Sequence, residues 1–365
     1  MLLLSVSLLP PVLISLLSVT AAAAVDVREV RSILTKRVES GRAVGIVVGI
    51  IAPGGQQIIA AGRITRERAT EPDGETVFEI GSITKIFTSL ALADMIEKGE
   101  VTPDEPVAEL LPSTVKVPSR GDRSITLLDL SMHVSGLPRL PSNLHLTPAN
   151  LANPYADYGT EKLYQFLSKY KLTRKPGETY LYSNLGAGLL GHALALKDGI
   201  SYERLIQQRI LQPLGMSSTT VRLSESQMGR LAQGYGRGLN PFAHAVRPVK
   251  NWDFDVLAGA GALRSTADDM LKFLAANLNL IHTPLAAAMR RMQSVRRETG
   301  RPNLQIAMGW HILTKYDREV YWHNGGTAGY RSFVGFNPTT REGVVVLCNT
   351  SVDNDDLGRH ILGAR

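Results

Sequence analysis

The chain has 365 residues, of which 44% are hydrophobic and 20% are charged, so it is long enough to bury a large core in one domain or two intertwined ones. Its formal net charge is +7, but the basic residues are scattered, without the clusters or the zinc-finger and basic-helix patterns of nucleic-acid-binding proteins. No nucleic-acid partner is therefore expected. The charge suits anionic substrates or a negatively charged cell envelope, and a basic surface without an electrostatic role is the simpler explanation.

The N-terminus has the pattern of a signal peptide. An almost wholly apolar stretch runs from Met1 to Thr20, ends in four alanines and is followed by charged residues from Asp26 onward. No Lys or Arg precedes the apolar stretch, so an uncleaved membrane anchor is the alternative. Pro10 and Pro11, and the shortness of the stretch, argue against an anchor. We expect a secreted or periplasmic protein with no stable membrane span after cleavage.

Strand patterns are predicted near both ends of the mature chain, and helical patterns in its middle. A helix over 27–38 is followed by two strands over 44–52 and 57–61, joined by a Pro-Gly-Gly turn. Candidate helices separated by Pro- and Gly-bearing loops occupy the middle, at 83–98, 127–132, 161–170, 185–195, 202–212 and 267–278. Short strands then return, with a last helix at the C-terminus, at 306–313, 319–322, 332–336, 343–347 and 356–362.

This order predicts an α+β fold, in which an antiparallel sheet built from N- and C-terminal strands is flanked by helices and carries an inserted, mainly helical region. We place the signal peptide at 1–24, an α/β sheet domain at 25–79 plus 285–365, and the mainly helical domain at 80–284. The single cysteine, Cys348, lies in an apolar strand-like segment and has no partner within the chain, so we interpret it as a small core residue.

Other functional motifs are absent or lie in the wrong context. The segment Gly186-Ala-Gly188-Leu-Leu-Gly191 matches the dinucleotide fingerprint, but its glycines lie within a helical pattern, so we assign them to close helix packing. The eight histidines show no metal-ligand spacing, and the sequence contains neither a P-loop nor a G-x-S-x-G elbow. No cofactor and no metal are expected.

A Ser-x-x-Lys motif occurs three times, and context favours one of the three. The motif at Ser113 lies in a loop, and the motif at Ser168 lies at the exposed basic end of a helix. Ser82 instead begins an apolar helix, with Lys85 one turn further along the same face. Burial would lower the pKa of this amine and let it act as a base, and the helix N-terminus would present free N–H groups to an oxyanion. An N-cap serine with an ordinary helix lysine is the alternative.

Tyr182 and Asn184 form a second candidate element, between a Lys-Pro-Gly turn and the next helix. A phenol beside a cation can lose its proton below its usual pKa, so Tyr182 could take the proton of Ser82 and return it to the leaving group. Asn184 could donate to the substrate carbonyl region and hold Lys85. Taken alone, a tyrosine near a loop is usually a core-edge aromatic.

The third candidate element is the segment His323-Asn324-Gly325-Gly326, which follows a predicted strand. Glycines at a strand edge let a substrate backbone lie close and pair with the strand. The Gly326 amide could be a second oxyanion donor beside that of Ser82. A glycine-rich hairpin turn is the alternative.

Together these elements resemble the three boxes of the serine β-lactamase and penicillin-binding-protein superfamily, S-x-x-K, Y-x-N and K-T-G. The resemblance is greatest to the branch that holds class C β-lactamases, D-Ala-D-Ala carboxypeptidases and family VIII carboxylesterases, and it extends to the segments 126–138, 175–177, 212–216 and 259–270. It implies the following roles: nucleophile Ser82, acid/base pair Lys85 and Tyr182, orienting group Asn184, third box His323, Asn324 and Gly325, and oxyanion donors Ser82 and Gly326.

Two departures from the family pattern leave the substrate open. The third box lacks its lysine, which favours a substrate carboxylate in β-lactamases, and His323 is expected to be charged only part of the time near neutral pH. Beyond the Gly-Leu-Pro turn, where class C enzymes place a glutamine, this chain has Arg139, which could supply the missing positive charge.

The resemblance implies a serine hydrolase that forms an acyl-enzyme at Ser82 with a small-molecule substrate. Hydrolysis of a β-lactam is the first expectation. A carboxylesterase activity or a D-Ala-D-Ala carboxypeptidase activity on peptidoglycan peptides stays open, and a non-catalytic envelope-binding or sensor domain is the remaining alternative. The protein is expected to be a monomer.

Overall fold

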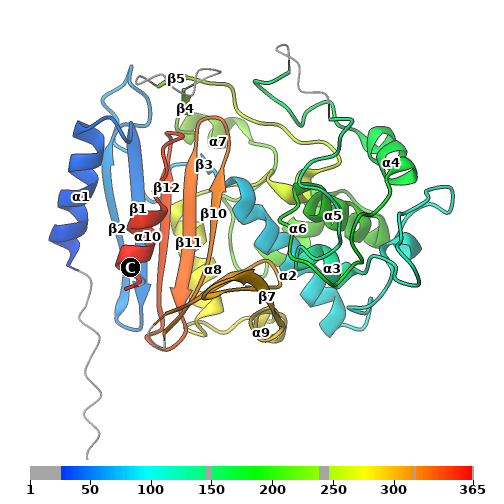
Figure 1. Cartoon of the computed structure of the whole chain (residues 1–365). Helices are drawn as coiled ribbons and strands as arrows, with labels where there is room; N and C mark the ends of the chain where they lie inside the picture. The colour runs from blue at the N-terminus through cyan, green and yellow to red at the C-terminus, as the bar shows by residue number, and fades with distance from the viewer. Residues whose placement is uncertain (1–25, 145–149, 238–245, 316–317, 364–365) are drawn as a thin grey trace, which may run out of the picture.

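The computed structural model of the chain describes residues 26–144, 150–237, 246–315 and 318–363 (Figure 1). The predicted signal peptide at 1–24 lies outside these residues. Across the described ranges, every helix is too short or too polar to cross a membrane.

An eight-stranded antiparallel sheet joins the two ends of the chain, in the order β2-β1-β12-β11-β10-β9-β8-β7 (Figure 1). Its strands are β1 (Gly45–Ala52), β2 (Gly55–Gly62), β7 (Arg296–Arg301), β8 (Leu304–Ala307), β9 (His311–Lys315), β10 (Arg318–Gly326), β11 (Arg331–Asn337) and β12 (Glu342–Cys348). Two small ladders pair β3 (Phe78–Glu79) with β6 (Arg264–Ser265) and β4 (Tyr235–Gly236) with β5 (Arg247–Pro248). The predicted α+β fold with an antiparallel sheet built from both termini is confirmed.

The helices lie on both faces of the sheet and in the region beside it (Figure 1). They are α1 (Val27–Glu39), α2 (Thr84–Glu97), α3 (Leu127–Ser131), α4 (Thr160–Lys169), α5 (Asn184–Asp198), α6 (Tyr202–Ile206), α7 (Glu225–Arg230), α8 (Ala267–Asn277), α9 (Ala286–Ser294) and α10 (Asp355–Ile361). Short 3₁₀ turns are η1 (Gly81–Ile83), η2 (Val107–Leu110) and η4 (Ala258–Ala260), and η3 (Gln207–Leu211) is a π-helical turn.

The apolar central strands are buried on both faces, because helices cover each of them. Alternate residues of β1 point to opposite sides: Ile46 packs in the layer formed by α1 and α10, whereas Val47 packs in the larger core that contains α8 and α2 (Figure 1). Cys348 is fully buried in the α1–α10 layer, which confirms its interpretation as a core residue. The helix α8, which the sequence analysis counted with the helical domain, packs on β1 and β12; the domain boundaries themselves stay a prediction.

Several predicted elements are extended or divided. The predicted strand 306–313 is two strands, β8 and β9, with a turn between them in which Gly309 has a φ of +74°. The predicted strand 319–322 continues to Gly326, so the third candidate element lies within β10 instead of after it. The predicted helix 202–212 changes from α6 to the π-helical turn η3.

The glycines of the rejected dinucleotide motif allow close packing of α5, as expected. A Cβ at Gly188 would lie 2.6 Å from the side chain of Leu257, and one at Gly191 would lie 2.9 Å from the backbone of Gly259. Helix α5 therefore lies directly against η4, the turn whose last residue, Ala260, contributes to the site described below.

Candidate active site

Ser82 lies in the turn η1, immediately before α2. Strands β10 and β11 of the sheet contact this turn and hold it in position. Ser332 of β11 donates a hydrogen bond of 2.8 Å to the carbonyl oxygen of Ile80. A Cβ at Gly325 of β10 would overlap this same carbonyl, so only glycine lets the turn approach the strand. Gly81 has a φ of +51°, and a Cβ there would lie 2.7 Å from the Gly326 nitrogen. The backbones around Ser82 and Gly326 therefore lie side by side, as an oxyanion hole shared between them requires.

Lys85 lies one turn after Ser82 in α2, a helix that is buried nearly all round. Its Nζ atom lies 3.0 Å from the Ser82 Oγ atom in a hydrogen bond, and it donates a second hydrogen bond of 2.6 Å to the Ala260 carbonyl. The side chain is 2% exposed. Burial, aided by the field of Arg139, holds the pKa of this amine well below its usual range, as the apolar helix predicted.

Tyr182 joins the pair from the segment before α5. Its side chain is hydrogen-bonded to Ser82, and its ring centroid lies 4.9 Å from the Lys85 Nζ atom. Burial raises the pKa of the phenol, and the opposing effects of the Ser82 hydrogen bond and the Arg139 charge are smaller. The predicted lowering of this pKa is therefore wrong, because loss of solvent disfavours the phenolate more than nearby cations favour it. The three groups are nevertheless brought together as predicted.

Asn184 is the first residue of α5, next to the N-cap Ser183. Its side-chain amide donates to the Tyr155 hydroxyl at 3.1 Å, and its Oδ1 atom is buried without a hydrogen-bond partner in the described part of the chain. No hydrogen bond joins the described side chains of Asn184 and Lys85, so Asn184 holds Tyr155 rather than the lysine that we expected.

The third candidate element is divided between the interior and the cavity. His323 is 1% exposed, its Nδ1 atom donates to the Asn324 carbonyl at 2.6 Å, and its ring centroid lies 6.0 Å from that of Tyr182. Burial and the neighbouring His311 hold the pKa of His323 well below its usual range, so the expectation of a partial charge is wrong: this histidine is neutral. Asn324, Gly325 and Gly326 line the cavity in front of Ser82.

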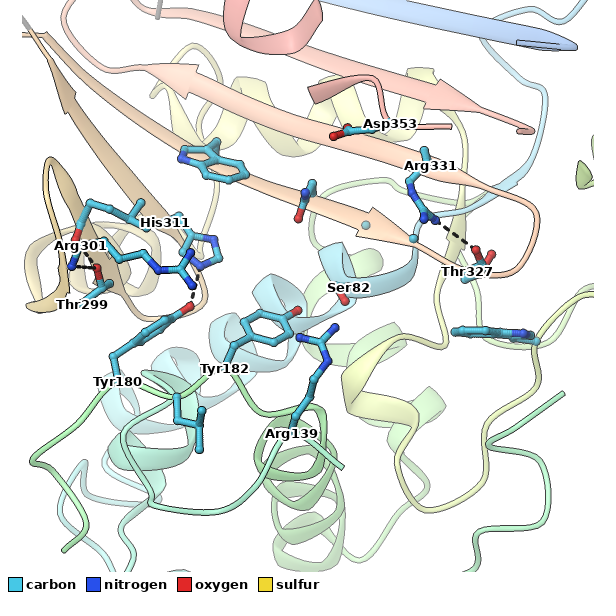
Figure 2. A pocket seen from close by; sticks show the side chains of 17 residues that line it. Ser82, Arg139, Tyr180, Tyr182, Thr299, Arg301, His311, Thr327, Arg331 and Asp353 are labelled. Carbon is cyan, nitrogen blue, oxygen red and sulfur yellow. Dashed lines mark hydrogen bonds between the residues drawn. The ribbon is translucent and has the colours of Figure 1, made fainter. Parts of the chain in front are cut away.

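The cavity in front of Ser82 has a volume of about 830 Å³, and strand β10 forms one wall (Figure 2). It is lined by Ser82, Arg139, Tyr180, Leu181, Tyr182, Trp252, Thr299, Arg301, Leu304, His311, Trp322, Asn324, Gly325, Gly326, Thr327, Arg331 and Asp353. Three arginines and one aspartate thus face the space above the serine. Within the described residues, no group of His, Cys, Asp or Glu side chains could hold a metal ion.

His133, which was not among the predicted site residues, packs against Tyr182. Its ring centroid is 4.5 Å from that of Tyr182, and its Nδ1 atom accepts a hydrogen bond of 3.1 Å from the Ser183 amide. The residue has a φ of +58°, a backbone conformation that is unusual for a side chain of this size. His133 lies in the segment 126–138, which resembles the family pattern and could have marked it as a candidate. The sequence did not show that this segment would pack against Tyr182.

A model of the Beta-lactamase family matches residues 30–364. The chain belongs to the Beta-lactamase family. The D-alanyl-D-alanine-carboxypeptidase/endopeptidase AmpH of Escherichia coli (strain K12) is 28% identical, over 83% of this chain and 78% of the relative. A Beta-lactamase of Pseudomonas fluorescens is 24% identical, over 91% of this chain and 96% of the relative.

Solved structures agree with this membership. The class C beta lactamase from Rhodobacter sphaeroides has a TM-score of 0.76 and 27% identity, and the match covers 91% of this chain and 97% of that chain. The predicted superfamily and its class C branch are confirmed, and so is the prediction that this Beta-lactamase family member is a serine hydrolase enzyme.

Proposed function

We propose that Ser82 is the nucleophile of an acyl-enzyme mechanism, and that a β-lactam is the first substrate to test. The observation that carries this proposal is the contact of three groups at the floor of an 830 Å³ cavity: the Ser82 hydroxyl, the desolvated Lys85 amine and the Tyr182 phenol. Each lies where acyl transfer needs it, and the serine faces the cavity.

The pKa shifts suggest how the proton moves in this mechanism. The Lys85 amine, whose pKa is lowered, takes the proton of Ser82 as the Oγ atom attacks the substrate carbonyl carbon. The resulting oxyanion accepts hydrogen bonds from the Ser82 and Gly326 amides. Tyr182, whose raised pKa keeps it protonated, gives its proton to the leaving nitrogen and regains one from Lys85. Water then attacks the ester carbon while Lys85 takes one of its protons; the bond between this carbon and the Ser82 Oγ atom breaks, Lys85 gives the proton to Oγ, and the product leaves as an acid.

A second candidate is hydrolysis of a peptide that ends in D-Ala-D-Ala. Its support is the similarity to AmpH, whose name records a carboxypeptidase and endopeptidase activity. The mechanism would be the same, because only the leaving group and the acyl group differ. Ester hydrolysis uses the same residues as well, so one set of assays separates the three.

The test compares wild-type protein with Ser82→Ala on nitrocefin, a D-Ala-D-Ala peptide and p-nitrophenyl acetate, and detects the acyl adduct by intact-protein mass spectrometry. We expect turnover of nitrocefin and a penicillin-derived mass on the wild type, and neither on Ser82→Ala. Ser113→Ala is the matched control, because Ser113 begins another Ser-x-x-Lys motif and is exposed. An unchanged adduct on Ser82→Ala would refute the assignment. If the wild type hydrolyses only the peptide or only the ester, that compound class replaces β-lactams as the proposed substrate.

We also propose that the chain is exported and acts as a monomer. The apolar N-terminal stretch supports export, and the enclosure of the site by one chain supports the monomer. N-terminal analysis of the mature protein from a bacterial host should find a start near residue 25, and light scattering should give the mass of one chain. A retained Met1, or a dimer mass, would refute the respective proposal.

A further inference from the structure

We propose that Arg139 and Arg301 form a carboxylate-binding subsite beside Tyr180 and Tyr182, so that the enzyme selects substrates that carry a carboxylate on this side of Ser82. The inference rests on the proposed acyl transfer at Ser82. It adds that the substrate must carry a negative charge. It requires that these two arginines be the cations left free to meet an anion in the cavity.

The histidines near Tyr182 cannot supply this charge at neutral pH. His133, His311 and His323 have ring centroids 4.5, 6.3 and 6.0 Å from that of Tyr182. All three are buried, and burial lowers the pKa of each; that of His311 falls to about 4. The layer around the phenol is therefore aromatic and neutral, and the permanent positive charges among the lining residues are guanidinium groups.

Arg139 reaches the cavity from the loop after α3. Its carbonyl oxygen accepts hydrogen bonds from the amides of Asn184 at 3.0 Å and Leu185 at 3.2 Å, which fix this loop to the start of α5. Its guanidinium lies 5.1 Å from the Tyr182 ring centroid, and the side chain points toward Ser82 (Figure 2). Within the described residues, no carboxylate pairs with this guanidinium.

Arg301 reaches the cavity from the end of β7. Figure 2 shows its side chain beside Tyr180 and His311, on the side of Tyr182 away from Arg331. Burial raises the pKa of the Tyr180 hydroxyl to about 12, and the charges of Arg301 and Arg139 both oppose this rise, so both guanidinium groups act on the same part of the cavity wall. Like Arg139, Arg301 has no carboxylate partner among the residues that the structure describes.

Arg331, the third arginine of the cavity, is already satisfied. Its guanidinium donates to the carbonyl oxygens of Thr327 at 3.2 Å and Tyr330 at 3.0 Å. Burial lowers the pKa of Arg331, and the charges of Asp353 and Asp355 oppose this lowering. Arg331 therefore already has hydrogen-bond acceptors and nearby acidic groups, whereas the arginines near Tyr180 have no carboxylate partner among the described residues.

Two guanidinium groups without a carboxylate partner suit a substrate carboxylate, because each can present paired N–H donors to its oxygens and such charge-assisted hydrogen bonds are among the stronger ones in proteins. Both proposed substrate classes can present this group: a penicillin or cephalosporin has a ring carboxylate, and a D-Ala-D-Ala peptide has a terminal one. The inference therefore holds for either class and predicts that neutral derivatives of each are poor substrates.

The experiment measures kcat/KM for pairs of substrates that differ by one charge: a cephalosporin and its methyl ester, and a D-Ala-D-Ala peptide and its C-terminal amide. In Arg301→Gln we expect kcat/KM for the acid to fall about 10- to 100-fold, and that for the neutral partner to fall far less. Arg301→Lys should restore part of the preference. Arg139→Gln should also reduce the preference, together with a loss on both substrates, because Arg139 acts on Lys85 and Tyr182 as well.

The matched control is Arg174→Gln, which removes the same charge from an exposed position outside the cavity and should leave the preference for the acid intact. Raising the ionic strength should weaken the wild-type preference for the acid and leave that of Arg301→Gln nearly constant. Melting temperatures establish that each variant is folded. If Arg301→Gln is unfolded, Arg301→Lys carries the test, and a preference equal to that of the wild type refutes the subsite.

Failure of this inference is distinguishable from failure of the proposed function. If Ser82→Ala abolishes turnover but Arg139→Gln and Arg301→Gln keep the wild-type ratio of acid to neutral rates, the subsite is wrong and the acyl-enzyme mechanism stands. If Ser82→Ala hydrolyses both members of a pair at wild-type rates, the proposed mechanism is wrong, and the inference is overturned with it.

Discussion

Lys85 is an amine that the fold keeps away from water, at 2% exposure in a helix with apolar neighbours. Burying a group that can carry charge costs folding free energy, and here the pKa responds by falling. The amine serves the proposed reaction better without its proton, so the burial that costs folding free energy also favours the reactive form. Removing the amine should therefore lower the acylation rate without lowering the stability of the fold.

Lys85→Met tests this separation, because methionine fills a similar volume without a polar group. We expect the melting temperature to stay the same or rise, while the acylation rate falls by about 10²- to 10⁴-fold. Differential scanning fluorimetry and stopped-flow acylation by nitrocefin measure the two quantities. Lys98→Met is the control, since Lys98 caps the same helix and its side chain is 53% exposed; it should keep the wild-type acylation rate. A large loss of stability in Lys85→Met would contradict the argument.

Three residues show how far the sequence determines such chemistry. The direction of the Lys85 shift followed from its own helix, because the neighbours that bury it are local. Tyr182 and His323 were misjudged, because the side chains that exclude water from them come from β9, β10 and the segment after α3. Charge state depends on desolvation, and desolvation by distant segments leaves no trace in the spacing of one motif.

At the scale of elements, the short helix α3 positions the segment that carries His133 and Arg139. Thr126 and Asp129 form a capping box at its N-terminus, with hydrogen bonds of 3.1 Å in both directions. The Asp129 carbonyl then accepts a hydrogen bond of 2.9 Å from the Val134 amide, so the cap and the following turn are connected. The fit of the loop beneath Tyr182 should depend on this cap.

Thr126→Ala removes the side-chain acceptor of the box. We expect it to lower the free energy of unfolding by about 1 kcal/mol and to reduce kcat measurably, because the loop that carries His133 and Arg139 loses its anchor. Ser224→Ala provides the comparison, since Ser224 makes the same kind of box at α7, outside the cavity. Urea unfolding and steady-state kinetics should give similar stability losses for both variants and a kinetic defect for Thr126→Ala alone. Equal kinetics would show that the cap does not position the loop.

The elements that the sequence did not predict have identifiable causes. β7 has the sequence Arg-Arg-Glu-Thr-Gly-Arg, which has no apolar alternation, and it is a strand because it pairs with β8. The turn between β8 and β9 depends on Gly309, where a Cβ would meet Ser89 of α2. Both features are set by contacts distant in sequence, and β7 is also the element that brings Arg301 to the cavity.

At the scale of the molecule, Glu79 connects the N-terminal part of the chain to the segment that contains Trp252 and Arg264. It lies in the β3–β6 ladder at 4% exposure, accepts a 2.9 Å hydrogen bond from the Trp252 amide and lies 3.5 Å from the Arg264 guanidinium. Burial raises the pKa of this carboxyl to about 7, although the charge of Arg264, the nearby Thr327 and the hydrogen bond from the Trp252 amide oppose the shift. The stability of the whole fold is thereby linked to pH.

The sign of this link follows from where the proton is held. Between about pH 4.5 and 7 the unfolded chain has lost the Glu79 proton while the folded chain keeps it, so stability is full below this window and falls as pH rises through it. Glu79→Gln should remove the decline, which amounts to about 3 kcal/mol. Urea unfolding at pH 4.5 to 8 measures it, with the exposed Glu75→Gln as the control. Parallel pH curves for wild type and Glu79→Gln would contradict the link.

The order of strands also fixes when the enzyme can first work. Ser82 belongs to the first quarter of the chain, but the Ile80 carbonyl accepts a hydrogen bond from Ser332, the proposed oxyanion donor is Gly326, and β12 lies between β1 and β11. A growing polypeptide would therefore carry the proposed nucleophile through most of its synthesis before the rest of the site is made. On the proposed mechanism, Ser82 becomes reactive only when the final strands have joined the sheet.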